Sequence, residues 1–230
     1  MKLKRLFARL GKPKFRETVA IMPLPRRILD VGIANDSYLE CKSVFQGAVY
    51  TGLDLEPPGF AMEPGDDFIL RNLEDKDALN GIQTTYDLII VNHVLEHLSA
   101  GEKVFARLCQ LLAPGGVLYA EFPSLRTAYS RKTASSYHFH DDRTHRRFYS
   151  LETLANTAIM ENCKILSCGP ISTPLKDVLA IPRALVGWVR GQGYGPFLLH
   201  ALRKIDHIMV RREFNTETNQ NLEASHRSGP

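Results

Sequence analysis

The amino-acid sequence predicts an α/β fold in which seven strands form a mostly parallel sheet with helices on both faces. Short apolar segments alternate with amphipathic helical segments from residue 26 onward, a pattern typical of parallel sheets covered by helices. The first strand carries Asp30 near its end and breaks at Gly32 into a turn that leads into a helix. Such a turn places a ligand at the carboxyl end of the strand. The length of 230 residues, with 44% apolar and 23% charged residues, suits one globular domain.

The individual elements follow from the apolar periodicity and from residues that begin or end helices. Ser150 is a suitable N-cap for the late helix, and Pro114, Gly115 and Gly116 separate the middle helix from the strand after it. The predicted strands are 26–33, 49–55, 68–73, 86–94, 116–122, 164–168 and 207–214, and the predicted helices are 36–45, 101–112 and 151–162.

Four segments depart from this alternation. Residues 1–25 are predicted to form a basic amphipathic N-terminal arm ahead of a domain that spans 26–214. Residues 124–149 lack a clear period and are longer than an ordinary connection, which predicts a lid loop over a binding site. Residues 173–205 have a helical pattern broken by proline and glycine, and are predicted to form a helical insertion before the last strand. The polar residues 215–230 are predicted to form a disordered tail.

Charge and cysteine content limit the class of protein. The net charge is +4, and residues 1–16 hold seven lysines and arginines and no acid. We interpret this segment either as a solvated helix on the domain or as a weak peripheral contact with a membrane surface. No apolar run is long enough to span a membrane, and no secretory signal follows the basic residues. The four cysteines form no CxxC pair, which favours buried free thiols in a reducing compartment. We therefore expect a cytoplasmic protein and leave its oligomeric state open.

The turn after the first strand does not suit a dinucleotide. A dinucleotide site requires GxGxxG with the pyrophosphate at the helix N-terminus. Here Ala34 replaces the second glycine, and Asp36 adds a negative charge where a phosphate would lie. These residues favour a ligand that carries an ammonium group and no phosphate, and they argue against a nicotinamide oxidoreductase.

Five segments lie in a specific order along the chain, and the resemblance they carry covers roughly residues 26–162. They are ILDVGIAND, TGLDLEPP, YDLIIVNHVLEHL, LLAPGGVLYAEFP and HRRFYSLETLANTAIMENCKILS. Each motif alone is weakly specific, whereas their order and spacing together are strongly specific. Together they resemble the class I S-adenosylmethionine-dependent methyltransferases, in particular the small-molecule branch. The resemblance implies a Rossmann-like fold, S-adenosyl-L-methionine as cofactor and a small-molecule methyl acceptor.

The resemblance also implies a donor pocket. Asp30 would face the ammonium of the methionine moiety, and Gly32 lets the backbone approach the ligand. Asp54 would accept both ribose hydroxyls. Asn72 stands where the family has an aspartate that receives the adenine amine, and its amide oxygen can still accept that bond. The complete predicted set of cofactor-binding residues is Asp30, Gly32, Ala34, Asp54, Leu55, Asn72, Leu73 and Asn92.

Methyl transfer needs a general base only when the acceptor must lose a proton, because the sulfonium already activates the methyl carbon. The candidates for a catalytic role are His93, His140 and His145. His97 and Glu96, in the LEHL motif, are predicted to be structural.

The histidines between residues 138 and 145 also permit a metal interpretation, with His138, His140, Asp141 and His145 as ligands. No regular scaffold or HExxH motif supports it, so we predict no metal. An acceptor-binding lid is favoured instead, in which Arg143, Arg146 and Arg147 would bind a carboxylate or phosphate group.

The predicted function is transfer of a methyl group from S-adenosylmethionine to an oxygen, nitrogen or carbon of a small-molecule acceptor, amphiphilic and glycan-type acceptors included. A non-catalytic methyltransferase-like binding module is the alternative, because two glycine positions of the first motif are substituted. Nucleic acid is not an expected partner. The (D/N)PP(Y/F) motif is absent, and basic residues are not interleaved with aromatic residues.

Overall fold

The computed structural model describes residue 18, residues 20–22, 24–33, 35–129, 138–171 and 205–213, without the side chains of residues 35 and 36. Several predictions lie outside these residues. They concern most of the basic arm, Ala34, the helical insertion before the last strand and the C-terminal tail. The middle of the lid loop, residues 130–137, also lies outside them.

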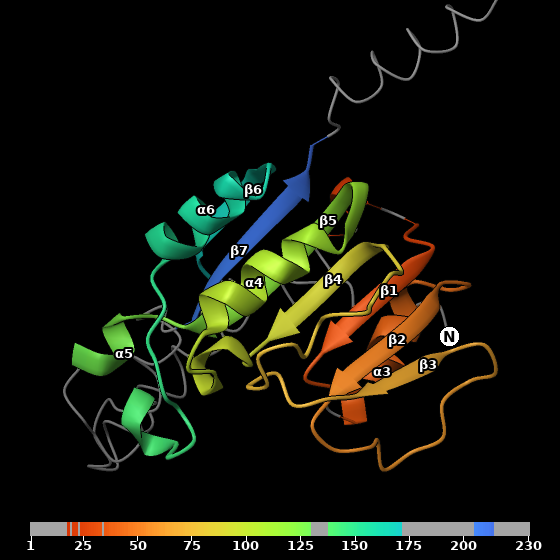
Figure 1. Cartoon of the computed structure of the whole chain (residues 1–230), viewed down its shortest axis with the longest axis horizontal. Coiled ribbons are helices and arrows are strands. Elements are labelled where there is room, and N and C mark those ends of the chain that lie inside the picture. The colour runs from red at the N-terminus through yellow and green to blue at the C-terminus, as the bar shows by residue number, and fades with distance from the viewer. Residues whose placement is uncertain are drawn as a thin grey trace, which may run out of the picture.

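Seven strands form one mixed sheet with the order β3-β2-β1-β4-β5-β7-β6 (Figure 1). All neighbours are parallel except at β7, which is antiparallel to both β5 and β6. This confirms the predicted seven-stranded, mostly parallel, Rossmann-like sheet. The strands are β1 (Arg27–Val31), β2 (Val49–Asp54), β3 (Asp67–Leu70), β4 (Tyr86–Asn92), β5 (Leu112–Pro123), β6 (Cys163–Pro170) and β7 (Ile205–Arg212).

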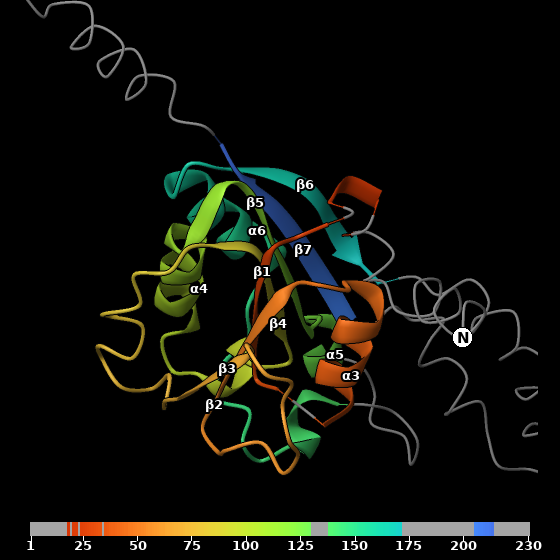
Figure 2. The ribbon, with the colours of Figure 1, turned by 90° about the vertical axis from the view of Figure 1, so that its right-hand side faces the viewer.

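Helices cover both faces of the sheet, as predicted. In Figures 1 and 2, α4 (Gly101–Gln110) and α6 (Leu151–Met160) lie on one face and α3 (Asn35–Val44) lies on the other. The hydroxyl of Ser150 accepts a hydrogen bond from the N–H of Thr153 at 3.0 Å, which confirms Ser150 as the N-cap of α6.

Two hydrophobic cores, one on each face, hold these helices. Side chains point alternately to opposite faces of a strand. In β4, Ile89 and Val91 therefore pack toward α4 and α6, while Leu88 and Ile90 pack toward α3. All four are fully buried, which explains why this strand has a continuous apolar sequence.

The structure corrects several predicted bounds. β5 begins at Leu112, four residues earlier than predicted, because Leu112 pairs with Tyr86 before the register shifts and Val117 pairs with Leu88, so the proline–glycine residues between them form an irregularity within the strand. The third strand ends at Leu70 and the last strand begins at Ile205. The predicted lid loop contains two short helices, α5 (Arg126–Tyr129) and η2 (Phe139–Asp141).

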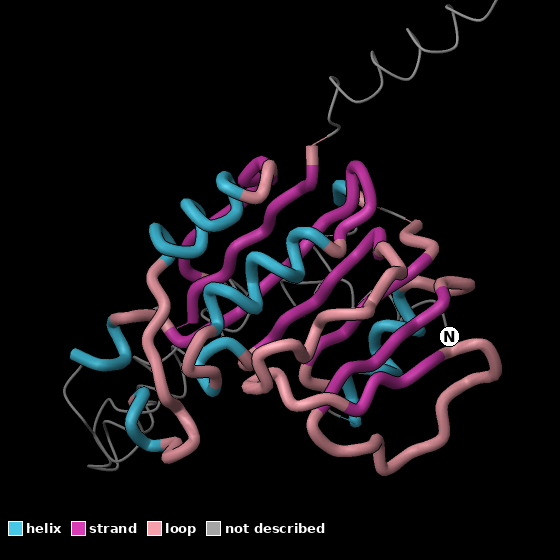
Figure 3. The backbone as a smooth tube through the Cα atoms, in the orientation of Figure 1, coloured by secondary structure: helices cyan, strands magenta, loops and turns pink. Residues whose placement is uncertain are grey.

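Irregular segments, rather than helices, connect β2 to β3 and β3 to β4 (Figure 3). Both segments begin at the carboxyl end of a strand, so they are free to surround a ligand there. The described part of the chain contains no helix long and apolar enough to cross a membrane. Cys41, Cys109 and Cys163 are buried free thiols, whereas Cys168 is exposed.

Candidate functional site

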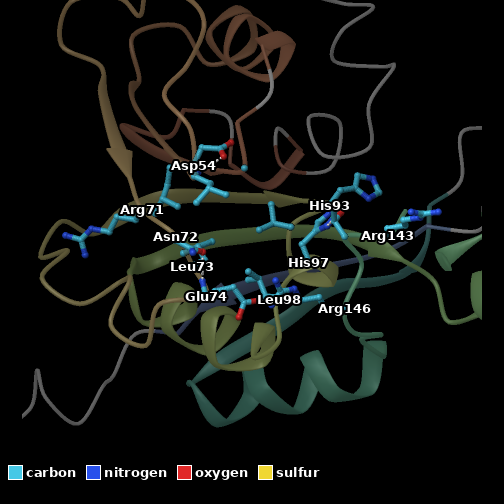
Figure 4. Close-up of a pocket in the computed structure, with 15 residues that line it drawn as sticks. Asp54, Arg71, Asn72, Leu73, Glu74, His93, His97, Leu98, Arg143 and Arg146 are labelled. Atoms are coloured by element: carbon cyan, nitrogen blue, oxygen red, sulfur yellow. Dashed lines mark hydrogen bonds and ion pairs between the residues drawn. The ribbon is translucent and has the colours of Figure 1, made fainter. Parts of the chain in front are cut away.

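A cavity of about 620 Å³ lies at the carboxyl ends of β1 to β4. Its wall is formed by the turn after β1, the ends of β2 and β3, the turn between β4 and η1 (Leu95–His97), and residues of the segment 143–146. In Figure 4, Asp54 and Asn72 lie toward one side, Arg143 lies at the opposite side, and His93 and His97 lie between them. The volume is in the range of small-molecule sites.

Gly32 is the first residue of the turn after β1. Its φ of +75° lies in the left-handed region, and its N–H donates to the carbonyl of Leu53 at 2.8 Å. A Cβ atom at this position would lie 2.3 Å from Cγ2 of Val94, which is far inside van der Waals contact. Both the backbone conformation and the space therefore require glycine.

Asp30 lies beneath this turn and is 2% exposed. Its Oδ2 accepts hydrogen bonds from the Tyr50 hydroxyl at 2.7 Å and from the Ser37 hydroxyl at 2.8 Å. Burial raises the pKa of Tyr50, and the Asp30 carboxylate beside it raises the pKa further, so the phenol stays protonated and donates. These bonds fix a negative charge behind the β1 turn.

Asp54 ends β2, and its side chain lines the cavity. One carboxylate oxygen accepts the N–H of Leu55 at 2.6 Å, and among the described residues the other oxygen has no hydrogen-bond partner. Asn72 follows β3, and its amide oxygen accepts the N–H of Glu74 at 3.0 Å. A carbonyl oxygen has a second lone pair, so this atom can still accept a bond from a ligand. Leu53, Leu55 and Leu73 supply apolar wall between these acceptors.

His93 lies where β4 ends and is strained. Its φ is +55°, an uncommon conformation for a residue with a side chain that is often found at functional sites. The backbone N–H donates to the carbonyl of Glu121 at 2.9 Å, and Nδ1 lies 3.2 Å from Oε1 of Glu96. The imidazole is 41% exposed and lines the cavity.

His97 lies on the same wall as His93, and the segment that follows η2 holds it in place. Its Nδ1 lies 2.8 Å from the Thr144 hydroxyl, which also bonds to a carboxylate oxygen of Asp142 at 2.6 Å. The hydroxyl and N–H of Thr144 lower the pKa of Asp142 through these bonds. The ring of His145 packs 4.8 Å from that of His97, measured between centroids.

Backbone bonds attach this segment firmly to η1 and α4. The carbonyl of Glu96 accepts the N–H groups of Arg146 and Arg147 at 2.8 and 3.2 Å. The Tyr149 hydroxyl accepts the N–H of Gly101 and donates to the carbonyl of Leu98, both at 2.8 Å. The second half of the predicted lid is therefore part of the cavity wall.

The two arginines of the wall differ in their electrostatic surroundings. Arg146 lies 3.5 Å from Glu74, whose carboxylate also accepts the N–H of Ser99 at 2.7 Å. Arg143 is exposed and, within the residues that the structure describes, has no ion-pair partner. The cavity therefore carries an unneutralised positive charge on the side opposite Asp54.

Comparison with known proteins identifies the family. Residues 2–167 match a family model described as a methyltransferase domain, which is well over half of the chain. The chain belongs to this family. It is a class I S-adenosylmethionine-dependent methyltransferase, and S-adenosylmethionine is its cofactor.

Individual relatives agree with the family. The chain is 26% identical over 209 residues to a trans-aconitate 2-methyltransferase of Acidovorax ebreus (strain TPSY), covering 84% of this chain and 80% of the relative. A methyltransferase structure from Mesorhizobium loti has a TM-score of 0.57 at 16% identity, covering 88% of this chain and 99% of that one. The N-methyltransferase NodS from Bradyrhizobium japonicum WM9, in complex with S-adenosyl-L-homocysteine, has a TM-score of 0.52 at 14% identity, covering 92% and 86%. At these identities the two structures show a shared fold.

One end of the cavity offers groups of the kinds that S-adenosylmethionine can bind. Asp54 and Asn72 offer acceptors for hydroxyl and amine donors, the leucines offer apolar contact, and Gly32 opens the turn. These residues fit S-adenosylmethionine. Of the predicted site residues, the cavity brings together Gly32, Asp54, Leu55, Asn72, Leu73 and His93.

Four other predicted residues do not line the cavity, and their roles stay predictions. Asp30 lies behind the β1 turn, and Asn92 ends β4. His140 is exposed on η2, while the side chain of His145 is only 3% exposed. The sequence interpretation did not assign His97, Thr144, Arg71 or Glu74 to a ligand site, although all four line the cavity. Only His97 carried a signal, through the LEHL motif.

Proposed function

We propose that this methyltransferase transfers the methyl group of S-adenosylmethionine to an oxygen of a small anionic acceptor that carries a carboxylate. One observation carries the proposal: Arg143 lines the cavity opposite Asp54 without an ion-pair partner among the described residues. A guanidinium group binds a carboxylate through two parallel hydrogen bonds. Arg146 is less available, because Glu74 lies beside it.

The chemistry of such an acceptor suits the residues that are present. A carboxylate is already ionised at neutral pH, so its oxygen needs no general base. When bound, S-adenosylmethionine supplies a methyl carbon activated by the sulfonium. The protein then contributes orientation and exclusion of water. Arg143 would hold the acceptor, while His93 and His97 form the wall between it and the donor end.

The relatives support the same acceptor class. The proteins from Acidovorax ebreus (strain TPSY) and Acidovorax sp. (strain JS42) are both named trans-aconitate 2-methyltransferase, after a tricarboxylic acid. With the exposed guanidinium of Arg143, this favours a small di- or tricarboxylic acid over the amphiphilic or glycan-type acceptors also considered from sequence. Transfer to nitrogen or carbon is correspondingly disfavoured.

A matched panel of acceptors tests the proposal. Trans-aconitate and other di- and tricarboxylic acids are incubated with radiolabelled S-adenosylmethionine beside their primary amides. The acids should be methylated and the amides should not. Arg143→Ala should raise the acceptor KM about 10- to 100-fold, as expected for loss of a hydrogen bond to a charged group worth about 1.5–3 kcal/mol. Arg126→Ala, an exposed arginine of α5 outside the cavity, is the control.

Two outcomes would contradict the proposal. Amides methylated as well as acids would remove the anionic acceptor, as would an Arg143→Ala variant with an unchanged KM for every acid. Binding of S-adenosyl-L-homocysteine without turnover of any acceptor would favour the alternative, a non-catalytic binding module.

A further inference from the structure

We propose that Glu96, His97 and His145 form a binding site for one divalent transition-metal ion in the wall of the cavity. Each residue offers one ligand atom, and these atoms all lie within 4.8 Å of one another. The ligands of a bound ion lie about 3–3.5 Å apart, given bond lengths of about 2.0–2.2 Å. The most distant pair of ligand atoms therefore needs to approach by up to about 1.5 Å on metal binding.

The backbone brings these residues together from distant parts of the sequence. Glu96 and His97 belong to η1, and His145 belongs to the segment after η2. The carbonyl of Glu96 accepts the N–H groups of Arg146 and Arg147, so the residues next to His145 are fixed against η1. The arrangement is held by the backbone and does not depend on long flexible side chains.

Hydrogen bonds set both imidazoles in the tautomer that a metal requires. Nδ1 of His145 lies 2.7 Å from the carbonyl oxygen of Phe139, which can only accept, so Nδ1 carries the proton. The hydroxyl of Thr144 donates its single proton to the Asp142 carboxylate, so it must accept from Nδ1 of His97. When either ring is neutral, its lone pair is therefore on Nε2, and Nε2 of His145 lies 3.8 Å from a carboxylate oxygen of Asp142. Metal-binding histidines are commonly oriented in this way by a second acceptor.

Glu96 supplies an independent indication. Its side chain is 1% exposed, and Oε2 has no hydrogen-bond partner among the described residues. His93 contacts only the other oxygen, at 3.2 Å. A buried carboxylate oxygen without a partner is unfavourable in a folded protein. A cation between Glu96 and the two imidazoles would remove this deficit.

The donor set selects the class of ion. Two imidazole nitrogens and one carboxylate oxygen suit zinc, cobalt, nickel or ferrous iron, whereas magnesium and calcium prefer oxygen ligands. His97 also lines the cavity, so the ion would lie at its wall and could hold an oxygen of the acceptor beside Arg143. That last role rests on the proposed function, whereas metal binding does not.

Metal titration of the full-length, tag-free protein after treatment with a chelator tests the site. Calorimetry with Zn²⁺ should show one ion per chain, and Co²⁺ should give visible absorption bands that Zn²⁺ displaces. His97→Ala and Glu96→Gln should each weaken binding by more than about tenfold, since loss of an outer-shell contact alone typically costs about 10- to 100-fold. Thr144→Val removes the acceptor that orients His97, together with the bond to Asp142, but no metal ligand, and should weaken binding by about tenfold.

His138→Ala and His140→Ala are the matched controls, because they remove histidines of the same segment that are not in the cluster. Both should bind Zn²⁺ as the wild type does, and thermal melting verifies that every variant is folded. No saturable Zn²⁺ binding by the wild type would overturn the proposal. So would wild-type affinity in Glu96→Gln and Thr144→Val, or a loss confined to the two control variants. None of these results would contradict the proposed methyl transfer, which the acceptor panel tests separately.

Discussion

Asp54 is the residue whose position at the end of β2 bears most directly on donor binding. One of its oxygens accepts the N–H of Leu55, and the other has no hydrogen-bond partner among the described residues and lies at the cavity wall. Asp54→Ala should weaken binding of S-adenosyl-L-homocysteine by about 1–3 kcal/mol, the range expected when a charged acceptor of hydrogen bonds is lost. Calorimetry measures the change. Glu56→Ala, an exposed carboxylate outside the cavity, should bind as the wild type does.

The effect of crowding at Gly32 can be separated from that of its backbone conformation. Gly47 has nearly the same φ angle, but no neighbouring atoms would contact a Cβ there. Their φ angles are +75° and +80°, but a Cβ at Gly47 meets nothing within 4 Å. Gly47→Ala should therefore lower the free energy of unfolding by about 1 kcal/mol, whereas Gly32→Ala should lower it further and abolish donor binding. Denaturant unfolding measures both changes. Equal losses in the two variants would show that the contact with Val94 has no effect.

Prediction from sequence located residues correctly where they stand at the end of a strand, while their roles in binding stay predictions. Gly32 follows β1, Asp54 ends β2 and Asn72 lies two residues after β3, so periodicity alone places them at one edge of the sheet. Prediction from sequence failed where two residues distant in the chain come into contact only in the folded protein. The bond between His97 and Thr144 joins positions 47 residues apart, and no local pattern indicates it. The two hydroxyls on Asp30 likewise come from other elements.

At the level of elements, apolar periodicity predicted which segments are strands but not which strands are neighbours. β7 lies between β5 and β6, although it follows both in the chain. Its alternating sequence is compatible with several positions in a sheet, and the choice depends on packing across both faces. The extended start of β5 was missed because its proline and glycines normally end a strand.

The lid segment carries a prediction about turnover. His140→Ala and His145→Ala should each lower the rate, on the order of 10- to 100-fold for a misplaced acceptor, while leaving S-adenosyl-L-homocysteine affinity intact. The reason is that both histidines lie on the segment that bears Arg143 and outside the donor end of the cavity. Steady-state kinetics and calorimetry separate the two effects. Wild-type turnover in both variants would remove the lid histidines from the mechanism.

The whole molecule should discriminate between nucleotide cofactors. α3 begins directly after the β1 turn, and Asp36 lies in its first turn. An aspartate at a helix start adds a negative charge, which disfavours the pyrophosphate that a helix N-terminus otherwise attracts. We therefore expect no binding of NAD or NADP at about millimolar concentration, a level at which even weak nucleotide sites are occupied. Fluorescence titration measures this, and saturable quenching by either dinucleotide would be inconsistent with the charge argument.

We infer that the carboxyl ends of β1 to β4 form the methyl-donor site of this protein. Calorimetric titration of the full-length wild-type chain with S-adenosyl-L-homocysteine tests it most directly, since binding requires neither the acceptor nor a metal. We predict saturable binding at one site per chain, weakened in Asp54→Ala and retained in Glu56→Ala. Absence of binding to the wild type, or equal affinity in all three proteins, would contradict the claim.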